Sequence, residues 1–156
     1  MKFLRSVDNL SYSLASSQAR IFEKSISFGI PSKIFIKSFM TSNEALWLDN
    51  LNLGIAGLSE IEIFDEIGKK VSTKKGGLYP FSIMHYIGYF YRMASYLTGF
   101  SSKELYKKIK PELLFRNYQT LHSLSIEEAI EEVFEIVNMK EEDKYSSFKK
   151  IYNMDL

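Results

Sequence analysis

The sequence contains no cysteine, only three prolines and only two histidines. Without cysteine the chain has no disulfide and no thiolate metal or redox site, and a reducing compartment is the expected setting. His85 and His122 lie far apart in the chain, so a zinc site of the His-Glu-x-x-His type is excluded. No GxxxxGK[ST] or GxGxxG phosphate loop is present either. We therefore expect no metal, no cofactor and no catalytic residue.

Long apolar runs are also lacking. The longest uncharged stretch, residues 76–91, contains Gly, Pro, His and Ser and is too short to span a bilayer. Residues 1–5 lead directly into polar positions, so no apolar signal segment is expected. We expect a soluble, cytoplasmic protein without a membrane partner.

What the chain does contain is enough apolar material for a core: 46% of its 156 residues are hydrophobic and 15% are aromatic. This composition excludes a disordered or low-complexity chain, and the length predicts a single domain over residues 1–156. Residues 69–78 are polar, cationic and contain Gly76-Gly77. We interpret them as a mobile loop within that domain.

Helix-start signals recur and predict an all-α fold. Capping boxes are indicated at Thr41…Glu44, Ser59…Glu62, Ser101…Glu104 and Ser125…Glu128, and Pro31 and Pro111 suit first helical positions. We expect a compact bundle of about seven helices around a nearly apolar central helix, residues 80–98. Residues 31–40 also alternate like a strand, but Pro31 favours a helix. The other predicted segments are helices at 10–28, 42–49, 59–70, 101–109, 111–122 and 125–138, and an irregular stretch or short strand at 50–58.

The central helix carries an unusual stripe, with His85, Gly88, Arg92 and Ser95 at helical spacing and Tyr89 and Tyr96 on its border. One interpretation is structural: Arg92 pairs with an internal Glu, and Gly88 permits close helix packing. The other is that the stripe faces a partner, since Tyr and Arg are enriched at interfaces. His85 alone is more typical of a structural histidine than of a general base. An enzyme would require His85, Arg92 and His122 to converge in one pocket.

Two charged regions allow further interpretations. Residues 123–143 hold eight Asp and Glu against one Lys, which indicates either a solvated helix face or a docking surface for a basic partner. Residues 101–122 could be a helix pair that reads DNA. Its base-reading candidates are Arg116, Asn117 and Gln119, and its phosphate-binding candidates are Lys103, Lys107, Lys108 and Lys110. Apolar residues occupy much of the second helix, so DNA binding is our alternative to protein binding.

Three segments carry a family resemblance: Phe35-Ile-Lys-Ser-Phe-Met-Thr-Ser42 followed by Leu48-Asp49, Tyr86-Ile-Gly-Tyr-Phe-Tyr-Arg92 followed by Thr98-Gly-Phe-Ser-Ser-Lys-Glu-Leu-Tyr106, and Asn117-Tyr-Gln-Thr-Leu-His-Ser123 followed by Ile126-Glu-Glu-Ala-Ile130. In these the chain resembles small, largely uncharacterised helical antitoxin-like proteins of low-GC bacterial toxin–antitoxin systems. The resemblance implies a protein that is not an enzyme and that neutralises a cognate toxin by direct contact, with an ADP-ribosyltransferase-like enzyme as a candidate toxin. Self-association stays open. The face that we expect to bind the partner consists of His85, Gly88, Tyr89, Arg92, Tyr96, Ser101, Ser102 and Lys103.

Overall fold

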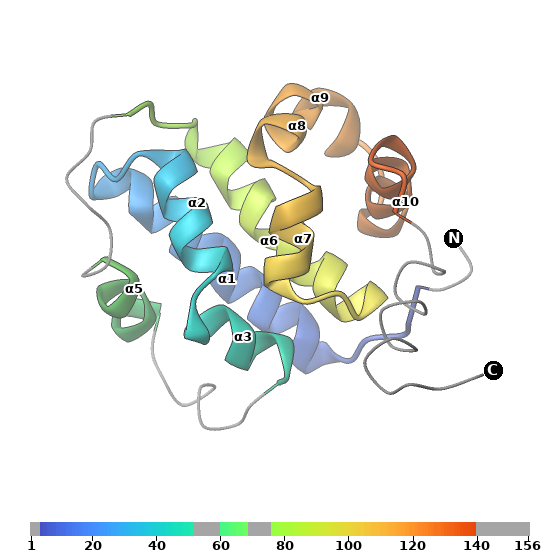
Figure 1. The fold of residues 1–156 in the computed structure, drawn as a ribbon, viewed down its shortest axis with the longest axis horizontal. Helices are drawn as coiled ribbons and strands as arrows, with labels where there is room; N and C mark the ends of the chain where they lie inside the picture. Colours follow the sequence, from blue (N-terminus) through green and yellow to red (C-terminus); the bar gives the residue numbers. More distant parts are fainter. Residues whose placement is uncertain (1–3, 52–59, 69–75, 140–156) are drawn as a thin grey trace.

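The computed structural model describes residues 4–51, 60–68 and 76–139, and their secondary structure is helical, with no strand among them (Figure 1). The helices are α1 (Asn9–Ser27), α2 (Ser32–Met40), α3 (Asn43–Asp49), α5 (Glu60–Gly68), α6 (Phe81–Thr98), α7 (Ser102–Lys108), α8 (Pro111–Arg116), α9 (Tyr118–Leu121) and α10 (Ile126–Ile136). The all-α prediction is confirmed. The described residues hold nine helices where we expected about seven, and the predicted 111–122 helix is two, divided at Asn117. Most of the predicted 50–58 segment and residues 69–75 of the predicted loop lie outside the described residues.

The two longest helices, α1 and α6, form the most extensive helix pair and run antiparallel. Early in the chain, the Arg5 backbone N–H donates to the Leu97 carbonyl over 2.7 Å. Further along α1, Gln18 Nε2 donates to the Gly88 carbonyl over 2.9 Å. A Cβ atom at Gly88 would lie 2.8 Å from Phe22 Cγ, so the helices approach too closely there for any side chain.

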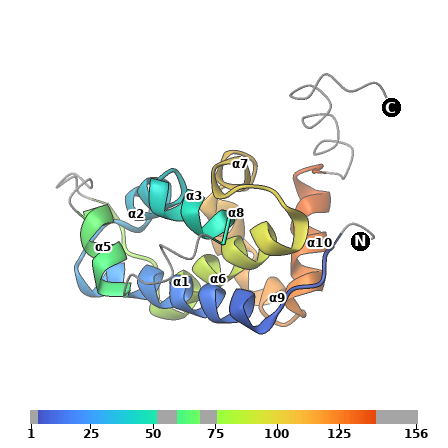
Figure 2. The same cartoon turned by 90° about the horizontal axis from the view of Figure 1, so that it is seen from below.

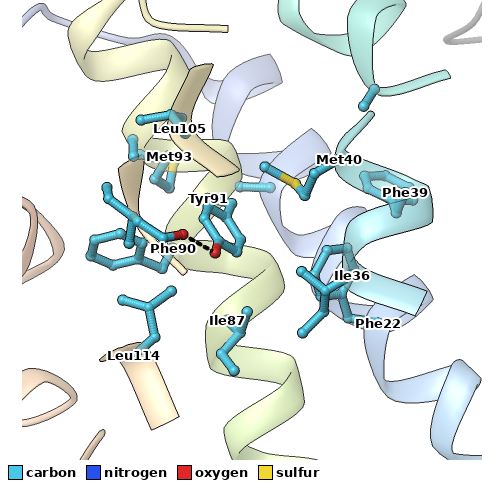
Figure 3. Close-up of a cluster of buried hydrophobic side chains, with 14 of the residues drawn as sticks. Phe22, Ile36, Phe39, Met40, Ile87, Phe90, Tyr91, Met93, Leu105 and Leu114 are labelled. Atoms are coloured by element: carbon cyan, nitrogen blue, oxygen red, sulfur yellow. Dashed lines mark hydrogen bonds between the residues drawn. The ribbon is translucent and has the colours of Figure 1, made fainter. Parts of the chain in front are cut away.

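The core fills the space between this pair and the helices that cover it. Figure 2 shows α2, α3 and α7 on one side of α1 and α6, with α10 at one end. Phe22 of α1 packs edge-on against Phe35 and Phe39 of α2, at ring centroid distances of 5.3 and 5.1 Å. In Figure 3 the hydroxyl of Tyr91, a fully buried α6 residue, donates to the Ile109 carbonyl over 2.5 Å.

Some of the predicted helix caps are present in the structure and one is not. The capping boxes at Ser101 and Ser125 are both present, and Pro111 occupies the first turn of α8. The box at Thr41 is wrong, because Ser42 caps α3 instead and accepts from the Ala45 N–H over 3.1 Å. Pro31 precedes α2 as its cap, one residue before the predicted position. The box starting at residue 59 lies outside the described part of the chain.

Candidate functional site

Arg92 lies at the centre of a buried polar network between α1, α3, α6 and α7. Its side chain has no exposed surface. Nε donates to Gln18 Oε1 over 2.7 Å, Nη1 to Asp49 Oδ1 over 2.5 Å, and Nη2 to Ser102 Oγ over 2.9 Å. Each edge of the guanidinium therefore has a partner, as a buried cation requires.

The Asp49 carboxylate is the second centre of this network. The Ser102 N–H donates to Oδ2 over 2.8 Å, and the Ser102 hydroxyl donates to Oδ1 over 2.5 Å. Ser95 Oγ adds a longer bond of 3.3 Å to Oδ1. Both charges are compensated inside the protein, so the network ties four helices together.

These contacts correct the expected partner-binding face. Gly88, Arg92 and Ser102 are buried, and Tyr96 is only 7% exposed, with its hydroxyl donating to the Leu48 carbonyl. The structural interpretation of the stripe fits this arrangement, because Gly88 lies at a close helix contact and Arg92 pairs inside the protein. The acidic partner of Arg92 is Asp49, however, and not the expected Glu. Four members of the expected face keep exposed surface: His85, Tyr89, Ser101 and Lys103.

His85 and Tyr89 open into a surface groove of about 520 Å³, which we call the tyrosine groove. It is formed where α1, the first half of α6 and α9 meet. Its lining residues are Glu23, Ser82, His85, Tyr86, Tyr89, Tyr118 and His122.

Polar and aromatic contacts order the tyrosine groove. His85 Nδ1 lies 2.5 Å from Glu23 Oε1, and these two side chains are 44% and 38% exposed. The His122 ring stacks on the Tyr118 ring with a centroid distance of 4.4 Å and an interplanar angle of 5°. Tyr86 meets Tyr118 edge-on at 5.5 Å. The groove thus joins ring faces to an accessible carboxylate.

The phenols of Tyr86 and Tyr89 stay neutral at physiological pH. Burial raises the pKa of Tyr86 well above its ordinary value of 10, and nearby Tyr118 adds to this shift. Burial, followed by the neighbouring Tyr12 and Glu127, also raises the pKa of Tyr89. The buried Tyr86 Oη has no hydrogen-bond partner among the described residues.

The chain matches no protein-family model, no curated protein and no solved structure. The geometry of the chain itself therefore has to support any function.

Most of the tyrosine groove was not predicted from the sequence. The expected face lacks Glu23, Ser82, Tyr86, Tyr118 and His122, although Tyr118 and His122 have the four-residue spacing that brings two rings together on a helix. His85 and His122 do share one pocket, as an enzyme would require. Arg92, the third residue of that requirement, does not line it.

The alternative DNA-binding residues lie on the surface around α7 and α8. Lys107, Lys108, Lys110 and Arg116 are exposed. The Lys110 ammonium lies 4.3 Å from the centroid of the Tyr106 ring. Asn117 Nδ2 donates to the carbonyl of Leu113, four residues earlier, over 2.8 Å. The proposed base-reading amide thus already donates to α8, the helix that Asn117 caps.

In the part of the chain that the structure describes, no group of three or more His, Asp or Glu residues could hold a metal ion. Within the same residues, no helix has both the length and the apolar character needed to cross a bilayer.

Proposed function

We propose that this chain is a cytoplasmic, antitoxin-type protein that binds a cognate toxin and neutralises it by direct contact. The tyrosine groove is the observation that supports a contact surface, because Tyr86, Tyr89 and Tyr118 are only partly buried there. Tyrosine offers a large rigid contact area at small entropic cost and is enriched where proteins bind one another. The antitoxin resemblance supplies the partner class, with an ADP-ribosyltransferase-like enzyme as one candidate.

Charge favours a basic partner surface. Glu23 lines the groove, and Glu127 of α10 is close enough to raise the pKa of Tyr89. The first turn of α10 carries Glu127 and Glu128, so acidic groups continue from the groove onto this helix. Complementary charge accelerates encounter and selects partners.

DNA binding through α7 and α8 is the second candidate, supported by the exposed Lys107, Lys108, Lys110 and Arg116. Against it, α8 has only six residues, about 9 Å at 1.5 Å per residue, which is short for a helix that reads a major groove.

The test is capture of partners by the tagged chain in its native cell, followed by mass spectrometry. Wild type should retain one protein at a fixed stoichiometry. Tyr89→Ala should lose that protein, because Tyr89 lies in the groove, whereas Lys107→Ala, at an exposed position of α7, should retain it. Arg92 is unsuitable for this test, because substituting a buried ion-pair partner disrupts the fold.

The reverse pattern decides against the proposal. If Lys107→Ala loses the captured partner and Tyr89→Ala retains it, and if DNA is recovered, the binding surface is α7 and α8 and the second candidate is correct. Circular dichroism and thermal unfolding of both variants establish that each is folded.

A further inference from the structure

We propose that the tyrosine groove is a binding site for a guanidinium group, carried either by a small free ligand or by an arginine side chain of a protein partner. The arginine of a protein partner rests on the proposed function, whereas the small free ligand does not.

The lining of the groove favours a cation. Among its seven described lining residues, Glu23 supplies a carboxylate that is 38% exposed, and none is Lys or Arg. The faces of tyrosine rings attract cations that lie within about 6 Å of the ring centroid. Glu127 adds negative charge beside Tyr89.

A buried site in the same protein shows that a carboxylate, a hydroxyl and a tyrosine ring together bind a guanidinium group. The buried Arg92 guanidinium is bound by the Asp49 carboxylate and the Ser102 hydroxyl, and its Cζ lies 5.4 Å from the Tyr96 ring centroid. The groove offers the same three kinds of group at the surface: a carboxylate, hydroxyls and tyrosine rings. Those in the groove are Glu23, Ser82, Tyr86, Tyr89 and Tyr118.

The hydrogen-bond acceptors of the groove favour a guanidinium over a quaternary ammonium ion. A guanidinium has five N–H donors in one plane, so it can stack on a ring while it donates to a carboxylate at its edge. A quaternary ammonium has no donor and gains nothing from Glu23 beyond charge. His85 Nδ1 lies 2.5 Å from one Glu23 oxygen, so the imidazole lies directly beside the carboxylate at the groove.

The experiment is an NMR titration of the full chain with methylguanidinium chloride at constant ionic strength. Tetramethylammonium chloride is the donor-free comparison. We expect saturable shifts confined to the groove, with binding weakened about tenfold in Glu23→Gln, which corresponds to one charge-assisted hydrogen bond. Tyr89→Leu should also weaken binding. Tyr106→Leu, a partly buried tyrosine outside the groove, should leave it unchanged.

A second titration distinguishes the two sources. The probes are the peptide Gly-Arg-Gly and its neutral counterpart, in which citrulline replaces arginine. Tighter binding of the arginine peptide than of methylguanidinium indicates a partner's side chain, and equal binding indicates a free ligand. Equal shifts with the citrulline peptide, or unchanged affinity in Glu23→Gln, would overturn the guanidinium site. Capture of a toxin that depends on Tyr89 but not on Glu23 would leave the proposed function standing without this site.

Discussion

Arg92 Nη1 and Asp49 Oδ1 lie 2.5 Å apart, and the two side chains are 0% and 8% exposed, so this ion pair is enclosed by protein. It joins the middle of α6 to the last residue of α3. The segments that carry the antitoxin resemblance include both residues and also Ser102. Three residues of these segments therefore make contacts that stabilise the fold.

Removing one member of this pair should be costly. We expect Arg92→Met and Asp49→Leu each to lower the free energy of unfolding by about 3–5 kcal/mol, because each leaves the other charge buried and unpaired. The double variant should recover part of the loss. Urea unfolding measures all three, and Arg116→Met, at an exposed arginine, should change stability by less than about 0.5 kcal/mol. Additive losses in the double variant would contradict the coupling.

Gly88→Ala should destabilise the protein although alanine favours helices by about 1 kcal/mol. The new Cβ would lie 2.8 Å from Phe22 Cγ and 3.0 Å from the Gln18 carbonyl oxygen. We expect a net loss of about 1–3 kcal/mol from overpacking, measured by thermal unfolding. Gly77→Ala is the control, since no atom lies within 4 Å of its Cβ position. A stabilised Gly88→Ala would mean that α1 and α6 do not meet there.

Tyr91→Phe should show a pH-dependent effect. Burial raises the pKa of Tyr91 well above 10 in the folded state. The phenol of Tyr91 ionises near pH 10 in the unfolded chain and only at higher pH in the folded protein. The stability that the neutral phenol contributes is therefore fully present below about pH 10 and is lost as the pH rises through the folded-state pKa. At pH 8 the variant should lose about 1 kcal/mol with the bond to Ile109. Unfolding at pH 8 and 11 should show this deficit shrink; a constant deficit would contradict the shift.

The cap of α3 can be located by a pair of substitutions. Ser42→Ala should cost about 1 kcal/mol, because Ser42 accepts from the Ala45 N–H. Thr41→Ala should cost less, since the Thr41 hydroxyl only donates to the Lys37 carbonyl at an exposed position. A larger effect at Thr41 in urea unfolding would restore the cap predicted from the sequence.

Tyr86→Phe should not lower stability, unlike Tyr91→Phe. The Tyr86 hydroxyl oxygen is buried without a hydrogen-bond partner among the described residues. Burying an unpaired hydroxyl lowers the free energy of unfolding, and Tyr86→Phe removes that penalty. We expect an unchanged or slightly higher midpoint in urea. A loss of 1 kcal/mol or more would reveal a partner for this hydroxyl.

Local signals allowed part of the fold to be predicted. The central helix, both capping boxes at Ser101 and Ser125, and the proline at the start of α8 all depend on residues within one turn of each other. Thr41 and Ser42 are both competent caps, but Thr41 ends α2, and Ser42 has the extended backbone that an N-cap requires. Spacing alone could not make that choice.

The candidate site depended on contacts that local spacing does not encode. Glu23 reaches His85, and Gln18 reaches Arg92, only because α1 and α6 run antiparallel and cross at Gly88. That crossing also decides which part of the His85–Ser95 stripe is buried. The stripe was recognised from its spacing, but its orientation toward α1 and α3 required the tertiary packing.

Neutralisation itself is the most direct test of the proposed function. The captured partner is expressed from an inducible promoter, and growth is followed with wild type, with the Glu23→Gln/Tyr89→Ala double variant, or with Lys107→Ala. The account predicts that the partner alone arrests growth, that wild type and Lys107→Ala restore it, and that the double variant does not. Growth that continues with the partner alone, or full rescue by a folded double variant, would contradict it.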